Sequence, residues 1–292
     1  MVRGAPPIAA SSIGAVAFNL EDLTSRQRRL LELWFPTMEV VADHSWGLVN
    51  TTVLEVTCGG DRFIVKAAGD ADHHIARETR AHRLWLRPWT SLGRAPELAH
   101  ADVNAKILAT RYQPGQLVLG SDAARNTDTY RQAGELLSLL HRQFGAGVAD
   151  HGYEDHENAK SLAWLDQPHR IAPPVEQRLR ATVTSWPTGP ATLVPTHGAW
   201  QPRNWLVEDG LVSLIDFGRA DLRPAGTDLI RLAAGEFRAA PDIEAAFIDG
   251  YGDDPRDGRL ESDAAPRGDR DRGVGVSGGR RNVRGAGTPH DR

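Results

Sequence analysis

The sequence predicts an α+β protein in which antiparallel strands come first and helices follow. Residues 39–112 hold β-branched runs separated by glycine-containing turns, with one long helical stretch among them. Beyond Asp122, apolar residues recur at helical spacing. The 292 residues are 40% hydrophobic and 25% charged, which is typical of a globular chain with one large or two small domains.

Residues 1–37 are expected to form an N-terminal segment that ends in a helix. Met1–Leu20 is rich in Ala, Pro and Ser but has no strong apolar stretch, so we expect an irregular start and not a signal peptide. Thr24 and Gln27 have the spacing of a capping box, which predicts that a helix begins there and stops at Pro36. Its packing residues would be Leu30, Leu31 and Trp34.

Residues 38–112 are expected to form the antiparallel sheet together with the long helix. Strand-like patterns alternate with glycine turns, and the helical stretch is followed by a proline, Pro88. The predicted elements are a strand over Val49–Thr57, a turn over Cys58–Asp61, a strand over Arg62–Lys66, a helix over Ala71–Arg87 and a strand over Ala105–Tyr112.

Residues 113–261 are expected to be mainly helical. Two interpretations of His151–Lys160, which is polar and acidic, stay open: a solvated loop, or a contact surface for a cationic substrate. The predicted helices are Asp128–Phe144, Pro173–Trp186, Thr227–Phe237 and Asp242–Tyr251.

Residues 262–292 are expected to be a disordered tail. From Arg267 to Arg292 there are seven Arg and seven Gly, and no Leu, Ile, Phe, Met, Trp or Tyr. Such a composition buries too little apolar surface to offset the entropy of ordering. A natural flexible tail and a shifted reading frame near Leu260 are both compatible with this abrupt change.

The charge balance argues against several classes of partner. The formal net charge is -4, so no basic excess points to nucleic acid or to an anionic membrane surface. No unbroken apolar stretch is long enough to span a bilayer. Cys58 is the single cysteine and cannot form an internal disulfide, which favours a reducing, cytoplasmic location.

Lysine is scarce in this chain, so each retained lysine invites a chemical explanation. The only ones are Lys66, Lys106 and Lys160. Lys66 ends an apolar strand, and Glu78 follows within the next predicted helix. Lysine is a compact point charge suited to phosphate oxygens, and a strand lysine paired with a helix glutamate is how kinases hold nucleotide phosphates.

A second constellation surrounds a predicted hairpin. Asn204 precedes the apolar run Trp205–Val207, an Asp209-Gly210 turn follows, and Asp216 ends the next apolar run. The hairpin would bring Asn204 and Asp216 together, and their oxygens are ligands of the kind that Mg²⁺ takes.

These residues together resemble the aminoglycoside phosphotransferase family over roughly Asp43–Tyr251. The resemblance is carried by His197-Gly198 with Asn204, by Ile215–Gly218 and by Thr227–Leu232. It implies a bilobal protein-kinase-like fold, with residues 38–112 as the N-lobe and residues 113–261 as the C-lobe. It also implies ATP and Mg²⁺ as cofactors, and transfer of the ATP γ-phosphate to a hydroxyl of a small molecule such as an antibiotic.

The same resemblance implies a role for each matching residue. Lys66 would hold the nucleotide phosphates, Glu78 would orient Lys66, and the backbone from Thr110 to Tyr112 would meet the adenine. In the second half of the motif, Asn204 and Asp216 would bind Mg²⁺, while His197 and Asp228 would support the catalytic loop.

Ala199 departs from the family pattern. It stands where the family has the aspartate that accepts the hydroxyl proton, and a methyl group can neither accept a proton nor form a hydrogen bond. The nucleotide loop also has a lone glycine, Gly47, and the C-lobe runs into the Arg/Gly tail. The alternatives are therefore an impaired small-molecule kinase and a nucleotide-binding pseudokinase that acts as a binding module.

The acceptor stays open at the level of the sequence. Asp150, Glu154, Asp155 and Glu157 suggest a cationic one, whereas homoserine-like, choline-like, sugar and macrolide acceptors all occur among related kinases.

Overall fold

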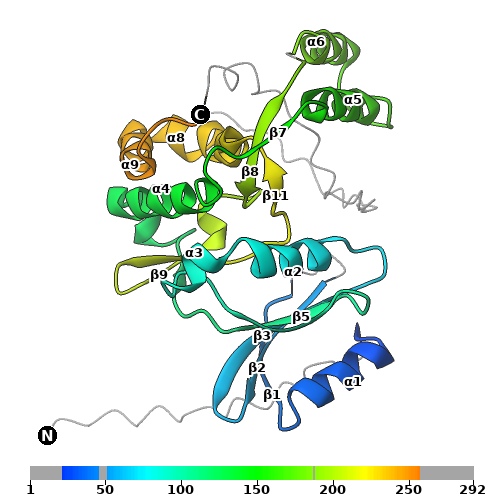
Figure 1. The fold of residues 1–292 in the computed structure, drawn as a ribbon, viewed down its shortest axis with the longest axis vertical. Helices are drawn as coiled ribbons and strands as arrows, with labels where there is room; N and C mark the ends of the chain where they lie inside the picture. Colours follow the sequence, from blue (N-terminus) through cyan, green and yellow to red (C-terminus); the bar gives the residue numbers. More distant parts are fainter. Residues whose placement is uncertain (1–21, 46–50, 187, 257–292) are drawn as a thin grey trace, which may run out of the picture.

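The structure is a computed structural model that describes residues 22–45, 51–186 and 188–256 (Figure 1). A strand-rich part and a helix-rich part lie one above the other, with α2 (His74–Leu84) between them. The predicted order of strands before helices is therefore confirmed. The expectations for Met1–Leu20, for Gly47 and for the tail over 262–292 fall outside the described residues.

The strand-rich part is a five-stranded antiparallel sheet in the order β1-β2-β3-β5-β4. Helix α1 (Ser25–Trp34) lies against it, and its capping box between Thr24 and Gln27 forms as predicted. The buried Leu31 and Phe35 pack with Val56 and Val65 of the sheet. The strands are β1 (Glu39–Asp43), β2 (Thr51–Cys58), β3 (Asp61–Ala68), β4 (Leu98–Asp102) and β5 (Ile107–Arg111).

The alternation of side chains along β3 decides which residues face the helix-rich part. Phe63 and Val65 point into the core beneath α1. Because successive strand residues point to opposite faces, Ile64 and Lys66 point the other way. The tight β2–β3 connection at Gly59-Gly60 fixes this register, with Val53 opposite Lys66.

The helix predicted over Ala71–Arg87 is wrong in its extent. It ends at Leu84, and a separate short helix, α3 (Arg87–Thr90), begins with Pro88 in its first turn. Proline lacks an N–H and clashes with the preceding turn, so it begins a new helix more easily than it continues one. The break turns Trp85, Leu86 and Trp89 into the core of the helix-rich part.

The helix-rich part is organised around the contact of α4 (Thr127–His141) with α9 (Pro241–Tyr251). Their backbones approach closely: a Cβ added to Gly134 would lie 2.1 Å from the Phe247 carbonyl oxygen, and one on Gly250 would lie 2.0 Å from that of Arg131. Its other helices are α5 (Tyr153–Leu165), α6 (Pro173–Thr184), α7 (Ile230–Ala234) and α8 (Glu236–Ala239).

Two small sheets complete this part. One has the order β10-β9-β6 and the other β11-β8-β7, and the second extends toward α5 and α6 (Figure 1). Their strands are β6 (Gln116–Leu117), β7 (Val148–Asp150), β8 (Ala191–Thr196), β9 (Trp205–Glu208), β10 (Leu211–Leu214) and β11 (Asp221–Arg223).

Two further sequence predictions need correction. His151–Lys160 is not a loop, because most of it lies in α5, where Glu154 and Asp155 occupy the first turn and favour the start of a helix. The helix predicted over Thr227–Phe237 is interrupted: a 3₁₀ turn over Ala225–Leu229 precedes α7, and Gly235 separates α7 from α8.

The predicted domain boundaries at residues 37, 112 and 261 stay predictions. One buried cluster joins Ala81, Trp85 and Trp89, from before residue 112, with Trp205 and Phe217, from after it. The two parts therefore share a core. None of the helices in the described ranges has the length and apolarity that a membrane crossing needs.

Candidate active site

The β9–β10 hairpin brings Asn204 and Asp216 together. Leu214 pairs with Trp205, and the backbone N–H of Ile215 donates to the carbonyl oxygen of Asn204 at 3.0 Å. The turn lies at Asp209-Gly210, both with positive φ (50° and 76°). The two residues that the sequence predicts at a metal site thus lie next to each other at the open end of one hairpin.

Asp216 meets Lys66, which comes from the sheet of the other part. Lys66 Nζ donates to Glu78 Oε1 at 2.8 Å, to Glu78 Oε2 at 3.0 Å and to Asp216 Oδ1 at 3.3 Å. The Glu78 side chain is 5% exposed, whereas that of Asp216 is 50% exposed. Three elements, β3, α2 and the segment after β10, therefore converge on one ammonium group.

The charges of this triad depend on one another. Burial raises the pKa of Glu78, and the neighbouring Lys66 opposes that rise. Lys66 lowers the pKa of Asp216. Burial acts to lower the pKa of Lys66, but Glu78 and Asp216 outweigh it and the net shift is upward. Lys66 is thus held as a cation beside an exposed carboxylate.

The side-chain amide nitrogen of Asn204 forms a hydrogen bond within the loop between β8 and β9, residues 197–204. Its Nδ2 donates to the Ala199 carbonyl oxygen at 2.8 Å, which turns the Oδ1 atom toward other partners. Asn204 Oδ1 and the Asp216 carboxylate are hard oxygen donors, and Mg²⁺ takes few protein ligands because it keeps waters and substrate phosphates. This donor set fits Mg²⁺. No cluster of three His, Cys, Asp or Glu suited to a metal occurs among residues 22–45, 51–186 and 188–256.

Asp228 holds the start of the loop from inside the core. Its Oδ2 accepts from the His197 backbone N–H at 2.8 Å and lies 3.1 Å from His141 Nε2, and its Oδ1 accepts from the Gly198 N–H at 2.6 Å. Burial acts to raise the pKa of Asp228, but His141 and these N–H groups outweigh it and lower it. The carboxylate is an internal anchor that fixes the backbone directly before Ala199.

His197 is a neutral structural residue. Its Nε2 lies 3.1 Å from the Ile215 carbonyl oxygen and must donate, while its Nδ1 lies 3.3 Å from the Ala199 N–H and must accept. This assigns the Nε2–H tautomer. Burial lowers the pKa of His197, which keeps the ring neutral. The ring ties the two segments that carry Asn204 and Asp216 to each other.

Ala199 is 1% exposed, so the methyl group at the position of the expected base is covered. Trp200, directly after it, lies 5.6 Å from Trp89 and 5.7 Å from Trp205, measured between ring centroids. Phe217 joins the same cluster through Trp89 at 5.9 Å. The loop and the segment that carries Asp216 therefore pack on a cluster of aromatic side chains. In the sequence these positions are recognised only as apolar.

Thr110 and Tyr112 lie on the same face of the sheet as Lys66. Thr110 pairs with Ile64, and the Tyr112 N–H donates to the Arg62 carbonyl oxygen at 2.9 Å, so the β3–β5 pairing continues past β5. The Arg62 guanidinium stacks over the Tyr112 ring at 3.6 Å. The N–H of Tyr112 is therefore already used within the sheet.

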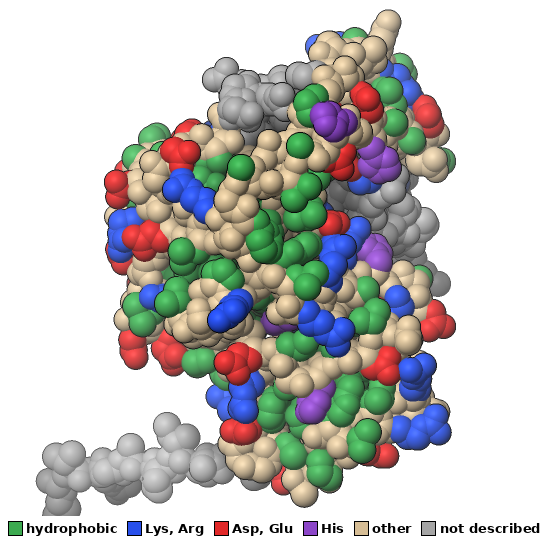
Figure 2. Space-filling view, in the orientation of Figure 1, with side chains coloured by type: hydrophobic (Ala, Val, Ile, Leu, Met, Phe, Trp, Pro, Cys, Tyr) green, Lys and Arg blue, Asp and Glu red, His purple; other side chains and the backbone are tan. Residues whose placement is uncertain are grey.

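Three contacts near the site have no sequence signal. His74 Nδ1 donates to the Gly218 carbonyl oxygen at 2.8 Å, and Arg80 Nη2 donates to Asp221 at 2.7 Å. Arg223 Nη1 donates to Thr196 Oγ1 at 3.0 Å. The first two join α2 to the segment after Asp216, and Figure 2 shows Lys and Arg side chains on the part of the surface where α2 lies.

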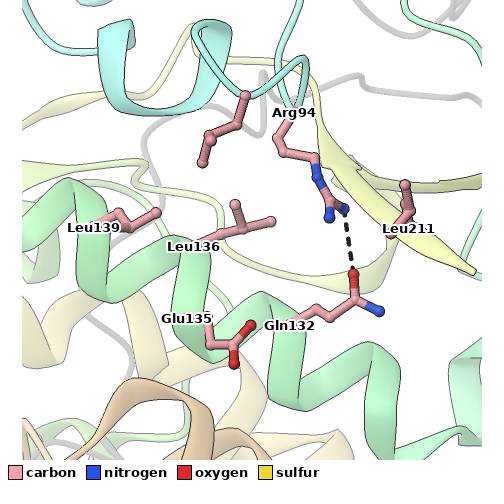
Figure 3. A pocket seen from close by; sticks show the side chains of 7 residues that line it. Arg94, Gln132, Glu135, Leu136, Leu139 and Leu211 are labelled. Atoms are coloured by element: carbon pink, nitrogen blue, oxygen red, sulfur yellow. Dashed lines mark hydrogen bonds between the residues drawn. The ribbon is translucent and has the colours of Figure 1, made fainter.

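A hollow of about 330 Å³ lies apart from these residues, between α4, β10 and the loop before β4 (Figure 3). In its wall, Arg94 Nη1 donates to Gln132 Oε1 at 3.2 Å and to the Val212 carbonyl oxygen at 2.7 Å. The Arg94 carbonyl oxygen accepts from the Leu214 N–H at 2.8 Å. These bonds hold β10, and through it they help to position Asp216.

The chain belongs to the phosphotransferase enzyme family, because the model of that family matches residues 41–261. The family resemblance of the sequence is thereby confirmed. No curated protein sequence matches the chain.

Solved structures of this kind share the fold. Macrolide 2'-phosphotransferase MphH from Brachybacterium faecium is 20% identical, with 83% of this chain and 87% of that chain covered and a TM-score of 0.55. Choline kinase LicA from Streptococcus pneumoniae is 16% identical, with 80% and 82% covered and a TM-score of 0.57. A thermostable mutant of aminoglycoside phosphotransferase APH(4)-Ia, in ternary complex with ADP and hygromycin B, is 13% identical, with 82% and 87% covered and a TM-score of 0.58. The predicted bilobal kinase-like α+β fold is confirmed.

Proposed function

We propose that this chain binds Mg-ATP between its two parts and has the architecture of a phosphotransferase that moves the ATP γ-phosphate to a hydroxyl of a small molecule. The observation that carries the proposal is the triad in which Lys66 lies between Glu78 and Asp216. A cation held by a buried carboxylate, beside an exposed carboxylate and an amide oxygen, is what phosphate and Mg²⁺ binding require. The family match supports the same conclusion.

Each residue has one task in this proposal. Lys66 binds phosphate oxygens, and Glu78 keeps its ammonium group in place. Asn204 and Asp216 hold Mg²⁺, which when bound neutralises charge on the transferred phosphate. Asp228 and His197 fix the loop, and the backbone from Thr110 to Tyr112 lies where the adenine binds.

Ala199 impairs the chemical step in this proposal. Proton acceptance by a positioned carboxylate contributes about 10²–10⁴-fold to a rate, and Ala199 has no group that accepts a proton. His197 does not replace it, because both ring nitrogens are engaged inside the loop. Asp216 faces Lys66 and the metal position.

The acidic residues of β7 and α5 support a cationic acceptor only in part, because Asp150 and Asp155 are exposed and Glu154 and Glu157 are not. Asp150 accepts from the Gly152 N–H, Glu154 is buried, and Glu157 pairs with Lys160 at 2.7 Å. The neighbouring structures are described as a macrolide phosphotransferase and a choline kinase, and one contains ADP with hygromycin B. Macrolides, choline and hygromycin B are small molecules, which supports a small-molecule acceptor here.

A second function follows from Ala199 itself. The proposed nucleotide-binding residues are all present, but the base position holds Ala199 and no carboxylate. The chain would then act as a nucleotide-binding pseudokinase and binding module. This alternative uses the same nucleotide-binding contacts as the first function, and it differs only in that no phosphate is transferred.

Two measurements on the full chain separate these outcomes. Mg-ATP is expected to raise the melting temperature of the parent protein, and no shift up to millimolar Mg-ATP would contradict both functions. Ala199→Asp is expected to raise ATP consumption with a panel of hydroxylated acceptors by about 10²-fold or more, whereas the matched amide Ala199→Asn is not. An aspartate variant that binds Mg-ATP but stays as inactive as its parent would favour the binding module.

A further inference from the structure

Arg223 places a guanidinium group directly against the catalytic loop. It ends β11, and its Nη1 donates to the Arg219 carbonyl oxygen at 2.9 Å and to Thr196 Oγ1 at 3.0 Å. A Cβ built on Gly198 would lie only 2.8 Å from the same Nη1. The positive charge therefore touches the residue that precedes Ala199.

No carboxylate compensates this charge within the described ranges. Ion pairs with N to O distances up to 4.0 Å link other partners there, and none involves Arg223. Asp221, two residues earlier on the same strand, binds Arg80 at 2.7 Å and lies 4.0 Å from Arg77. The carboxylates of Asp216 and Asp228 are engaged by Lys66 and by His141.

The half-buried position of Arg223 makes this unusual, because charged groups that leave water are normally paired. A guanidinium has five N–H groups, and both contacts above use Nη1. Among the described residues, the edge formed by Nε and Nη2 has no hydrogen-bond partner. That edge carries two parallel N–H groups, and it matches the oxygens of a carboxylate or phosphate in a bidentate manner.

We propose that Arg223 binds an anionic group of the acceptor, so that the acceptor is a small hydroxylated molecule with a phosphate or a carboxylate group. This inference rests on the proposed phosphotransfer function. In the proposed function Lys66 holds the nucleotide phosphates, whereas Arg223 lies at Gly198, directly before the base position Ala199, where the acceptor hydroxyl must arrive. The sequence-based expectation of a cationic acceptor is replaced by one of opposite charge.

The test compares acceptors that differ in charge but share a three-carbon hydroxylated skeleton. In the full chain with Ala199→Asp, ATP consumption is measured with glycerol, glycerol 3-phosphate and glycerate, and with choline as the cationic comparison. At least one anion is expected to have a kcat/KM about tenfold or more above glycerol, a ratio equal to about 1.4 kcal/mol. The comparison of glycerol 3-phosphate with glycerate decides whether the bound anion is a phosphate or a carboxylate. A clear preference for choline or for glycerol would overturn the proposal.

The role of Arg223 itself is tested by variants in the same background. Arg223→Gln is expected to raise KM for the preferred anion about tenfold, and to leave KM for glycerol and the Kd for Mg-ATP within about twofold. Arg223→Lys keeps the positive charge but lacks the two parallel N–H groups, and its KM for the preferred anion is expected to lie between those of the parent and of Arg223→Gln. Arg29→Gln, at an exposed position, is the matched control. Equal losses for anionic and neutral acceptors would show that Arg223 only braces the loop and would overturn the proposal.

Binding without turnover separates this inference from the proposed function. Glycerol 3-phosphate or glycerate is titrated into the parent protein with Mg-ADP present, and heat of binding is expected that Arg223→Gln abolishes. Should Arg223→Gln fail to fold, the Arg223→Lys variant provides the comparison. If Mg-ATP binds but neither anion does, the acceptor inference alone fails; if Mg-ATP does not bind, the proposed function fails.

Discussion

The Nζ atom of Lys66 lies 2.8 Å from Glu78 Oε1 and 3.3 Å from Asp216 Oδ1, so one cation joins a buried and an exposed carboxylate. Its two partners differ in what they do for the protein. Glu78 is enclosed and depends on Lys66 for charge compensation, whereas the Asp216 side chain is exposed to solvent. The left-handed backbone of Asp216, with φ of 66°, is a strained conformation at the point where the two parts of the molecule meet.

Lys66→Ala is expected to lower the free energy of unfolding by about 3 kcal/mol, because it leaves the Glu78 carboxylate buried without its partner. Lys160→Ala is the matched control, since its pair with Glu157 is more exposed than that of Lys66 with Glu78 and is worth about 1 kcal/mol or less. Urea denaturation measures both. Pairing Lys66→Met with Glu78→Gln is expected to recover much of the loss; equal losses for Lys66→Ala and Lys160→Ala would show that the Glu78 pair is not a buried one.

Gly198→Ala is expected to destabilise the protein by more than about 3 kcal/mol. Gly198 has a φ of 77°, and an added Cβ would lie 2.2 Å from the Arg219 carbonyl oxygen, so both strain and a backbone clash result. Gly210 has a φ of 76° with nothing within 4 Å of an added Cβ, and Gly210→Ala therefore reports strain alone, about 1 kcal/mol. Thermal unfolding of the pair checks this, and similar melting temperatures would contradict the close contact.

Asp228→Asn is expected to cost about 3–5 kcal/mol of stability, because the amide nitrogen would face N–H donors that now meet a buried carboxylate. The exposed Asp61→Asn is the control, with an effect below about 0.5 kcal/mol. The lowered pKa of Asp228 adds a pH dependence: its contribution is present above the ordinary aspartate pKa and is lost as the pH falls through the folded-state pKa. An unfolding free energy for Asp228→Asn close to that of Asp61→Asn would argue against the anchor.

His82→Phe is expected to weaken the loss of stability in mild acid. Burial lowers the pKa of His82 to about 3, and its Nε2 has no partner in the described part of the chain. The unfolded state then binds more protons below the ordinary histidine pKa of about 6.5, so stability falls as the pH decreases. Between pH 6.5 and pH 5 the stability is expected to fall by about 1.6 kcal/mol, because the full slope of about 1.36 kcal/mol per pH unit is reached only below the ordinary histidine pKa. If the unfolding free energies of parent and variant changed by the same amount across this pH range, the role of His82 would be ruled out.

Short-range features of this fold could be predicted because neighbouring residues produce them. The cap of α1 uses Thr24 and Gln27, three residues apart, and the hairpin that places Asn204 beside Asp216 needs only its own turn. The helix predicted over Ala71–Arg87 is too long, because Pro88 lies in the first turn of a new helix and does not merely follow the first one. For α5, polarity suggested a loop, although acidic residues in a first turn favour a helix.

The sequence by itself determined the family and the α+β fold. It also predicted the residues of the proposed nucleotide site, because the spacing of Lys66, Glu78, Asn204 and Asp216 follows from local strands, helices and turns. Only the tertiary structure decided what surrounds them. The bond of Arg80 to Asp221 spans 141 residues and that of His141 to Asp228 spans 87. Whether a charge such as Arg223 is compensated depends on which distant carboxylates fold toward it, and no local pattern contains that information.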